Sequence, residues 1–290
     1  MRVVQAAPGR WCNFRLRALT PVTGLALGMA VALVSSGPAL ARSPASDDAA
    51  PTYATPGTVW SLNLYQASVV RFQNPDWRAC TGAATLSMLN TIAVWSNEDQ
   101  ILPLGGRVPR TALSWQIDTS YETQENILAY ERNHMTMSWD FPGTDPHGWR
   151  NGLNYFGWGS INAGVYRDSV YNNFDAAARA TVISLARHGR PVGILGWAGS
   201  HAQYVTGYTV RGSDPRVSDD WTLLGVFLTD PLQADQTINE FVTYNAWQYG
   251  PLYTRLSPYW YRDSWLRDPV DGAIGAREWW GKFLIIDAVK

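Results

Sequence analysis

The chain has 290 residues, with 23 basic and 24 acidic side chains and a formal net charge of −1. This length is ample for one large domain, or one fold with two lobes, without disulfide cross-links. Because no segment is dense in lysine and arginine, we expect neither nucleic acid nor an anionic lipid surface as a partner. The only two lysines, Lys282 and Lys290, lie near the C-terminus, which argues against Schiff-base and phosphate-loop chemistry.

The first 41 residues have the pattern of a cleavable export signal. They contain four arginines, no acidic side chain, an apolar stretch over residues 24–34, and the small-residue sequence Ala39-Leu40-Ala41. The apolar stretch is shorter than the ~20 residues that a membrane span needs. We therefore predict a signal peptide at 1–41, a secreted protein that could associate with the cell envelope, and no membrane span after cleavage. An uncleaved anchor is the alternative.

Residues 42–58 are small, polar and interrupted by prolines, which is typical of a disordered leader. No internal repeat is visible after them. We therefore predict a single folded unit over residues 59–290.

Helical patterns dominate the first half of this unit. After a short strand at 68–72, apolar residues at helical spacing follow Cys80 directly. A third helix should begin with Asp145 as its N-cap and Pro146 at its first position. The helices predicted in this half cover residues 80–93, 122–132 and 146–155.

A fourth helix and a set of strands are expected in the second half. Asp175 is predicted to cap a helix over 176–187 that ends at Gly189. Apolar runs separated by turn residues then predict strands. These strands cover residues 191–197, 201–210, 221–228 and 283–286. Helices followed by an antiparallel sheet indicate the α+β class, with a cleft between two lobes.

Cys80 is the most informative residue, since the only other cysteine, Cys12, lies in the predicted signal peptide. An unpaired thiol in an exported protein is a liability unless it has a function. The start of a helix favours a thiolate, and a protonated histidine favours it further. His201 follows a predicted turn and could reach the thiol, while Asp230 at the end of the next strand could orient the imidazole. Gln73 and the Cys80 backbone N–H could stabilise an oxyanion.

Each of these residues alone is weak evidence. A single cysteine is more often a small buried hydrophobic residue, and most Asp-Pro pairs simply start turns or helices. The order and combination of the cysteine, histidine and aspartate carry the hypothesis.

At these residues the chain resembles the papain-like cysteine peptidases, and within them the bacteriocin-processing (double-glycine leader) peptidase-like family with its exported relatives. The similar segments are 73–84 around the cysteine, 145–156 in the third helix, 189–208 around the histidine, and 226–231 around the aspartate. Two positions depart from the family pattern. Thr81 follows the cysteine directly where the family often has glycine, and Gln73 lies seven residues before Cys80, one more than the commonest spacing.

The resemblance implies a papain-like two-lobed fold with the nucleophile at a helix N-terminus. It implies Cys80 as nucleophile, His201 as general base and acid, Asp230 as the residue that orients the histidine, and Gln73 in the oxyanion hole. The expected substrate is a peptide or protein, and no metal or organic cofactor is implied.

Two alternatives share the same residues. One is a catalytically inactive papain-like module that binds peptides or cell-wall material, and the other is a transglutaminase-like or amidase enzyme that uses the same triad. A serine hydrolase and a zinc peptidase are disfavoured, because the sequence contains neither Gly-x-Ser-x-Gly nor His-Glu-x-x-His.

Overall fold

The structure is a computed structural model, and it describes residues 57–65, 78–96, 100–101, 107–108, 121–136, 143–232, 238–260 and 279–290. All of these lie in the unit Ala50–Lys290. The predicted signal peptide, nearly all of the predicted leader, the predicted strand at 68–72 and Gln73 lie outside the described residues.

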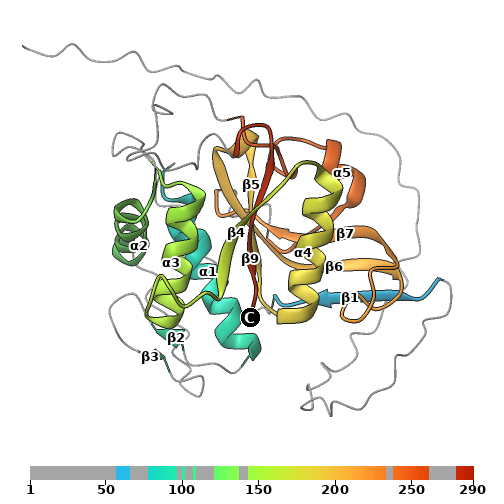
Figure 1. Cartoon of the computed structure of the whole chain (residues 1–290), viewed down its shortest axis with the longest axis horizontal. Helices are drawn as coiled ribbons and strands as arrows, with labels where there is room; N and C mark the ends of the chain where they lie inside the picture. The colour runs from blue at the N-terminus through green and yellow to red at the C-terminus, as the bar shows by residue number, and fades with distance from the viewer. Residues whose placement is uncertain are drawn as a thin grey trace, which may run out of the picture. The chain divides into compact units, whose positions relative to one another are not determined.

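Helices and strands alternate along the described chain (Figure 1). The α-helices are α1 (Cys80–Ser96), α2 (Tyr121–Asn133), α3 (Pro146–Trp158), α4 (Phe174–His188) and α5 (Tyr244–Tyr249), with a 3₁₀ turn η1 (Trp197–Gly199). The strands are β1 (Val59–Asn63), β2 (Gln100–Ile101), β3 (Arg107–Val108), β4 (Tyr166–Tyr171), β5 (Val192–Gly196), β6 (His201–Gly212), β7 (Trp221–Thr229), β8 (Glu240–Thr243) and β9 (Phe283–Ala288). Within these residues, no helix is both long and apolar enough to cross a membrane.

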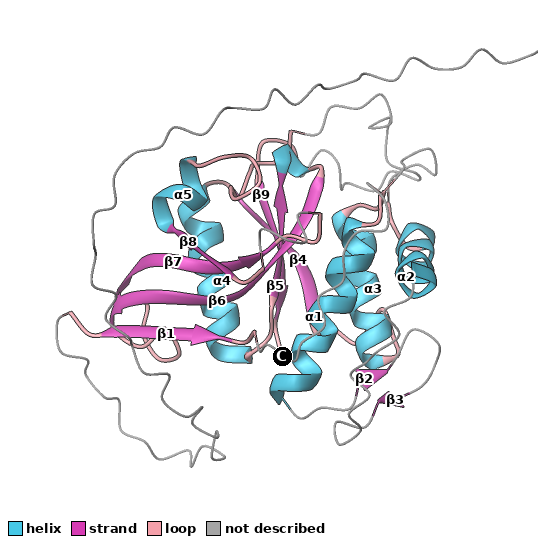
Figure 2. Cartoon of the chain, turned by 180° about the vertical axis from the view of Figure 1, so that it is seen from behind, coloured by secondary structure: helices cyan, strands magenta, loops and turns pink. Residues whose placement is uncertain are grey.

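A seven-stranded antiparallel sheet forms the centre, in the order β4-β9-β5-β6-β7-β8, with β1 paired to β6 (Figure 2). The long strand β6 pairs with β5 over its first half and with β1 over its second half. The α+β class is therefore confirmed. Helices and strands are less segregated than predicted, because β1 precedes all the helices, β4 lies between α3 and α4, and both strands join the sheet.

Two hydrophobic clusters bury the two faces of the sheet. Alternation along β9 shows the division, since Ile286 packs in the cluster with α1, α2 and α3, while Ile285 packs in the cluster with α4 and α5. Figure 1 shows α1, α2 and α3 grouped on one side of the strands and α4 on the other. The sheet is thus the middle layer. Helix α1 packs on one face of the sheet, and its first residues lie against β6.

The helix caps follow local chemistry, with one correction. Asp145 caps α3 as predicted, because its Oδ1 accepts the Gly148 N–H at 2.8 Å. The predicted Asp175 cap of α4 is wrong, since Asn173 accepts the Ala176 N–H at 2.8 Å instead. Asp175 lies in the first turn, where a negative charge is still favourable, and its carboxylate accepts a hydrogen bond from Tyr244.

Glycines allow α1, α2 and α3 to approach closely. A Cβ on Gly82 would lie 2.6 Å from the Gln124 carbonyl oxygen, and a Cβ on Gly152 would lie 2.6 Å from Glu131 Cγ. Glu131 is completely buried between these helices, and Thr85 Oγ1 donates to its Oε1 at 2.8 Å. Burial raises the pKa of Glu131 well above its usual range, which favours the protonated form of this side chain.

We expect Glu131→Gln to stabilise the protein at pH 8 by at least about 3 °C in melting temperature. A carboxyl whose folded pKa is raised loses stability as the pH rises from its unfolded value, about 4.3, toward its folded value. Glutamine resembles the protonated form and removes this loss. Thermal unfolding followed by circular dichroism across pH 4–9 measures it.

The exposed Glu240 at the start of β8 gives a matched control, Glu240→Gln, which should leave the melting temperature nearly unchanged. An unchanged decline of stability with pH in Glu131→Gln would contradict a proton held by Glu131.

Candidate active site

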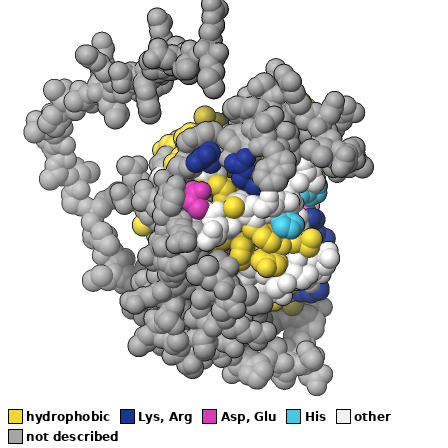
Figure 3. Space-filling view, turned by 90° about the vertical axis from the view of Figure 1, so that its left-hand side faces the viewer, with side chains coloured by type: hydrophobic (Ala, Val, Ile, Leu, Met, Phe, Trp, Pro, Cys, Tyr) yellow, Lys and Arg dark blue, Asp and Glu magenta, His cyan; other side chains and the backbone are white. Residues whose placement is uncertain are grey.

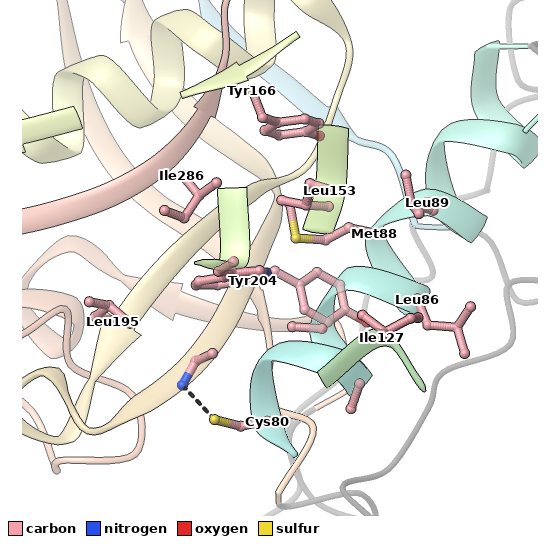
Figure 4. Packing of buried hydrophobic residues seen from close by; sticks show 14 of the residues in the cluster. Cys80, Leu86, Met88, Leu89, Ile127, Leu153, Tyr166, Leu195, Tyr204 and Ile286 are labelled. Atoms are coloured by element: carbon pink, nitrogen blue, oxygen red, sulfur yellow. Dashed lines mark hydrogen bonds between the residues drawn. The ribbon is translucent and has the colours of Figure 1, made fainter. Parts of the chain in front are cut away.

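Cys80 is the first residue of α1 and is nearly buried, in agreement with the predicted helix start. Its Sγ accepts the backbone N–H of Ala202 at 3.5 Å, the interaction drawn in Figure 4. Ala202 is the second residue of β6, so the thiol lies directly against the start of that strand. Because the first N–H groups of a helix have no partner within it, this position also supplies donors and partial positive charge.

His201 and Asp230 are brought together by the pairing of β6 with β7. The antiparallel register sets Tyr204 opposite Thr229, so that the start of β6 lies beside the end of β7. His201 Nε2 lies 2.6 Å from Asp230 Oδ1, and both side chains are buried. The aspartate therefore fixes the orientation of the imidazole.

The fully buried Asp230 carboxylate receives three hydrogen bonds. Besides the bond with His201, its Oδ1 accepts the Leu232 backbone N–H at 2.8 Å and its Oδ2 accepts Gln203 Nε2 at 2.8 Å. Burial alone would raise the pKa of Asp230, but these donors and the positive charge on His201 hold it below its usual range. Asp230 is therefore ionised over the whole physiological pH range.

His201 is protonated near neutral pH. Burial lowers its pKa, but hydrogen bonds to Asp230 and Cys80, together with the negative charges of both, outweigh burial and raise the pKa to about 9. Because Nε2 is engaged by Asp230, Nδ1 is the nitrogen that remains for the sulfur. The imidazolium thus lies between a carboxylate and the Cys80 thiol, an arrangement that stabilises a thiolate.

Gln203 is a site residue that the sequence analysis missed. It is fully buried, and its Nε2 donates to Asp230 and also to the Tyr253 carbonyl oxygen at 2.6 Å. Residues i and i+2 of a strand share a face, so Gln203 follows His201 on the same side of β6. A polar amide two residues after the histidine, on the same face of the strand, is the signal that could have identified it.

The turn before His201 has an unusual backbone. Trp197 and Ala198 adopt φ angles of 51° and 59°, a left-handed region that residues other than glycine rarely occupy. The turn predicted before His201 is confirmed, and it contains the 3₁₀ turn η1, which begins at Trp197. The Trp260 N–H donates to the Ala198 carbonyl oxygen at 2.8 Å, which holds the turn, and the Trp197 ring meets the His201 ring edge-on at 5.7 Å.

The structure thus brings Cys80, His201 and Asp230 to one place, and Gln73 lies outside the described residues. Within the described ranges, no group of three or more His, Cys, Asp or Glu side chains could hold a metal ion.

In comparisons with known proteins, no family model, no curated protein and no solved structure matches the chain. The assignment of a function therefore depends on the chemistry of the site alone.

We expect Gln203→Leu to lower the free energy of unfolding by about 1–3 kcal/mol, because it removes one donor from a buried carboxylate and leaves the Tyr253 carbonyl without this donor. It should also slow alkylation of Cys80 about tenfold, since a less firmly held Asp230 orients His201 less well. Urea unfolding and iodoacetamide kinetics measure the two effects.

Ser184→Ala is the matched control, because Ser184 donates a buried hydrogen bond to the Ala288 carbonyl oxygen away from the site. It should cost stability without slowing alkylation. A Gln203→Leu protein that is destabilised and alkylated at the normal rate would show that Gln203 is only structural.

Proposed function

We propose that the chain is an exported cysteine peptidase that hydrolyses peptide or related amide bonds through Cys80, His201 and Asp230. The observation that carries the proposal is the buried His201–Asp230 pair next to a cysteine at a helix N-terminus. We further propose that the fold is papain-like, with a helical lobe of α1, α2 and α3 that carries the nucleophile and a lobe built on the antiparallel sheet.

The reaction follows from the charges in the site. The Cys80 thiolate attacks the substrate carbonyl carbon, and the developing oxyanion is stabilised by N–H donors at the start of α1 and, as the sequence suggests, by Gln73. His201 Nδ1 gives its proton to the leaving amine as the C–N bond breaks. A water molecule then attacks the thioester, His201 takes its proton, and the released thiolate restores the first state.

The alternative of an inactive binding module is disfavoured because the buried charges and the strained turn of the site lower the stability of the fold. A buried carboxylate and imidazolium lose several kcal/mol of hydration, and two residues of the preceding turn occupy a strained backbone region. A binding surface needs neither feature. Transglutaminase-like or amidase chemistry uses the same triad, and the acceptor of the acyl group (water or an amine) distinguishes it.

We expect iodoacetamide to label Cys80 rapidly near pH 7, and His201→Ala to slow this labelling at least about 100-fold, because the mutant lacks the cation that stabilises the thiolate. Intact-protein mass spectrometry against time measures the rates. His134→Ala is the matched control, since His134 stacks on Tyr130 in α2 and its Nδ1 contacts the Tyr130 carbonyl.

Equal labelling rates in the wild-type and His201→Ala proteins would contradict the proposed mechanism. Cys80→Ser should abolish the rapid labelling, and any label on Cys12, the only other cysteine, should form at the same rate in all variants.

The pH dependence separates the acid role of His201 from its electrostatic role. Because the pKa of His201 is raised to about 9, we expect kcat/KM for amide hydrolysis to fall as the pH rises through about 9, where the proton for the leaving amine is lost. Alkylation by iodoacetamide needs no such proton and should not fall over the same range. A parallel fall in both rates would contradict the acid role.

A further inference from the structure

Four partly exposed apolar residues lie in segments that are hydrogen-bonded to, or pack on, the His201–Asp230 half of the site. Leu232, Tyr253 and Trp260 are between 37% and 46% exposed, and Trp197 is half-buried. We call these four residues the apolar rim.

Each rim residue is fixed to the site by a contact of its own. The Leu232 N–H donates to Asp230 Oδ1 at 2.8 Å, and the Tyr253 carbonyl oxygen accepts Gln203 Nε2 at 2.6 Å. The Trp260 N–H donates to the carbonyl oxygen of Ala198 in η1, and the Trp197 ring touches the His201 ring. Since three of the contacts use the main chain of the rim residue, these side chains originate next to the site.

The segment that carries two of these residues is held against the sheet along its length. The Ser257 N–H donates to the Leu195 carbonyl oxygen at 3.2 Å, between the contacts of Tyr253 and Trp260. A Cβ on Gly199 would lie 2.4 Å from the Tyr259 ring, so the segment and η1 are packed together without a gap. The backbone that carries Tyr253 and Trp260 is therefore held firmly in place.

Few charged side chains lie in the segment that carries Tyr253 and Trp260. Residues 250–260 contain one charged side chain, Arg255, which is half-buried. Exposed aromatic and aliphatic side chains next to a buried ion pair are costly to leave in water, and they favour a ligand that covers them with apolar groups.

We infer that the apolar rim binds the substrate on the His201 side of the scissile bond, and that the substrate is an extended peptide with large aromatic or aliphatic side chains next to that bond. The inference depends on the proposed function, because it names the substrate class of the same site. One methylene covered by a hydrophobic pocket is worth about 10- to 200-fold in discrimination, so a well-covered aromatic or aliphatic side chain should be strongly preferred over a small one.

The test uses the full chain and a series of peptidyl vinyl sulfones that share one peptide and differ only in the substituent on the sulfone, which occupies the leaving-group side next to His201 and mimics the side chain of Phe, Leu, Gly or Asp. Inactivation needs the thiolate and binding but no protonated leaving group, so it reports recognition directly. We expect the second-order inactivation rate with Phe or Leu to exceed that with Gly or Asp by at least about tenfold. Leu232→Ser and Tyr253→Ser should each reduce this ratio at least about threefold.

Val217→Ser is the matched control. Val217 is 66% exposed in the loop between β6 and β7, at the ends of these strands opposite to His201 and Asp230. It should leave both the rate and the ratio unchanged. Melting temperatures of all variants verify that they are folded.

The two proposals fail in different ways. If iodoacetamide labels Cys80 in a His201-dependent manner but the vinyl sulfones show no preference for Phe or Leu, the apolar rim is not the recognition surface and the proposed function stands. The same holds if the rim variants keep the full preference. If neither reagent labels Cys80 in a His201-dependent manner, the proposed function fails and the inference fails with it.

Discussion

A carboxylate that is fully removed from water must find its hydrogen bonds within the protein. Asp230 is such a carboxylate, so neighbouring residues have to supply donors to it. His201 and Gln203 meet it from the first residues of β6, and the Leu232 amide meets it from the chain just beyond β7. These donors converge only in one register of the two strands, because a slip by one residue would turn both side chains to the other face. The pairing that builds the sheet and the geometry that orients the imidazole are therefore the same interaction.

The Cys80 thiol is positioned next to this ion pair by the packing of the helical layer α1, α2 and α3. Cys80 belongs to the hydrophobic cluster that joins α1, α2 and α3 to the sheet, and in Figure 4 Tyr204 and Ile286 of the sheet lie near Met88 and Leu153 of the helices. The sulfur accepts the N–H of the residue next to His201, so a shift of α1 along the sheet would separate nucleophile and histidine. The close approach of the helices, with the fully buried Glu131 between them, restricts such a shift. Figure 3 shows the outer side of this helical layer, where charged, apolar and histidine side chains are mixed.

The sequence predicts those features that local patterns encode. Asp145-Pro146 specifies a helix start by capping and ring geometry, and the apolar runs before Asp230 and around His201 predict β6 and β7. The same patterns do not predict β4, because Arg167 and Asp168 interrupt its apolar character. Their charges are compensated only in three dimensions, by Asp287 of β9 and Arg150 of α3, and His147 of α3 also contacts Asp168. Asn173 and Asp175 are equally good caps, so cap preference alone does not choose between them. Burial of Phe174 as the first residue of α4 accompanies the earlier start, and burial of this kind is not visible in cap preferences.

The backbone conformation of η1 lowers the stability of the fold rather than raising it. A residue with a Cβ in the left-handed region costs about 1–2 kcal/mol relative to a relaxed conformation, and glycine at Trp197 or Ala198 would avoid most of that cost. The chain instead keeps a tryptophan there, with its ring against His201, and holds the turn through the Trp260 N–H. A large apolar ring next to a charged imidazole excludes water from one side of it, and this strengthens the interaction of the imidazolium with Asp230 and with a thiolate. The strain is thus compensated locally by a stronger ion pair, which gives a physical reason for a tryptophan at a position where folding alone would favour glycine.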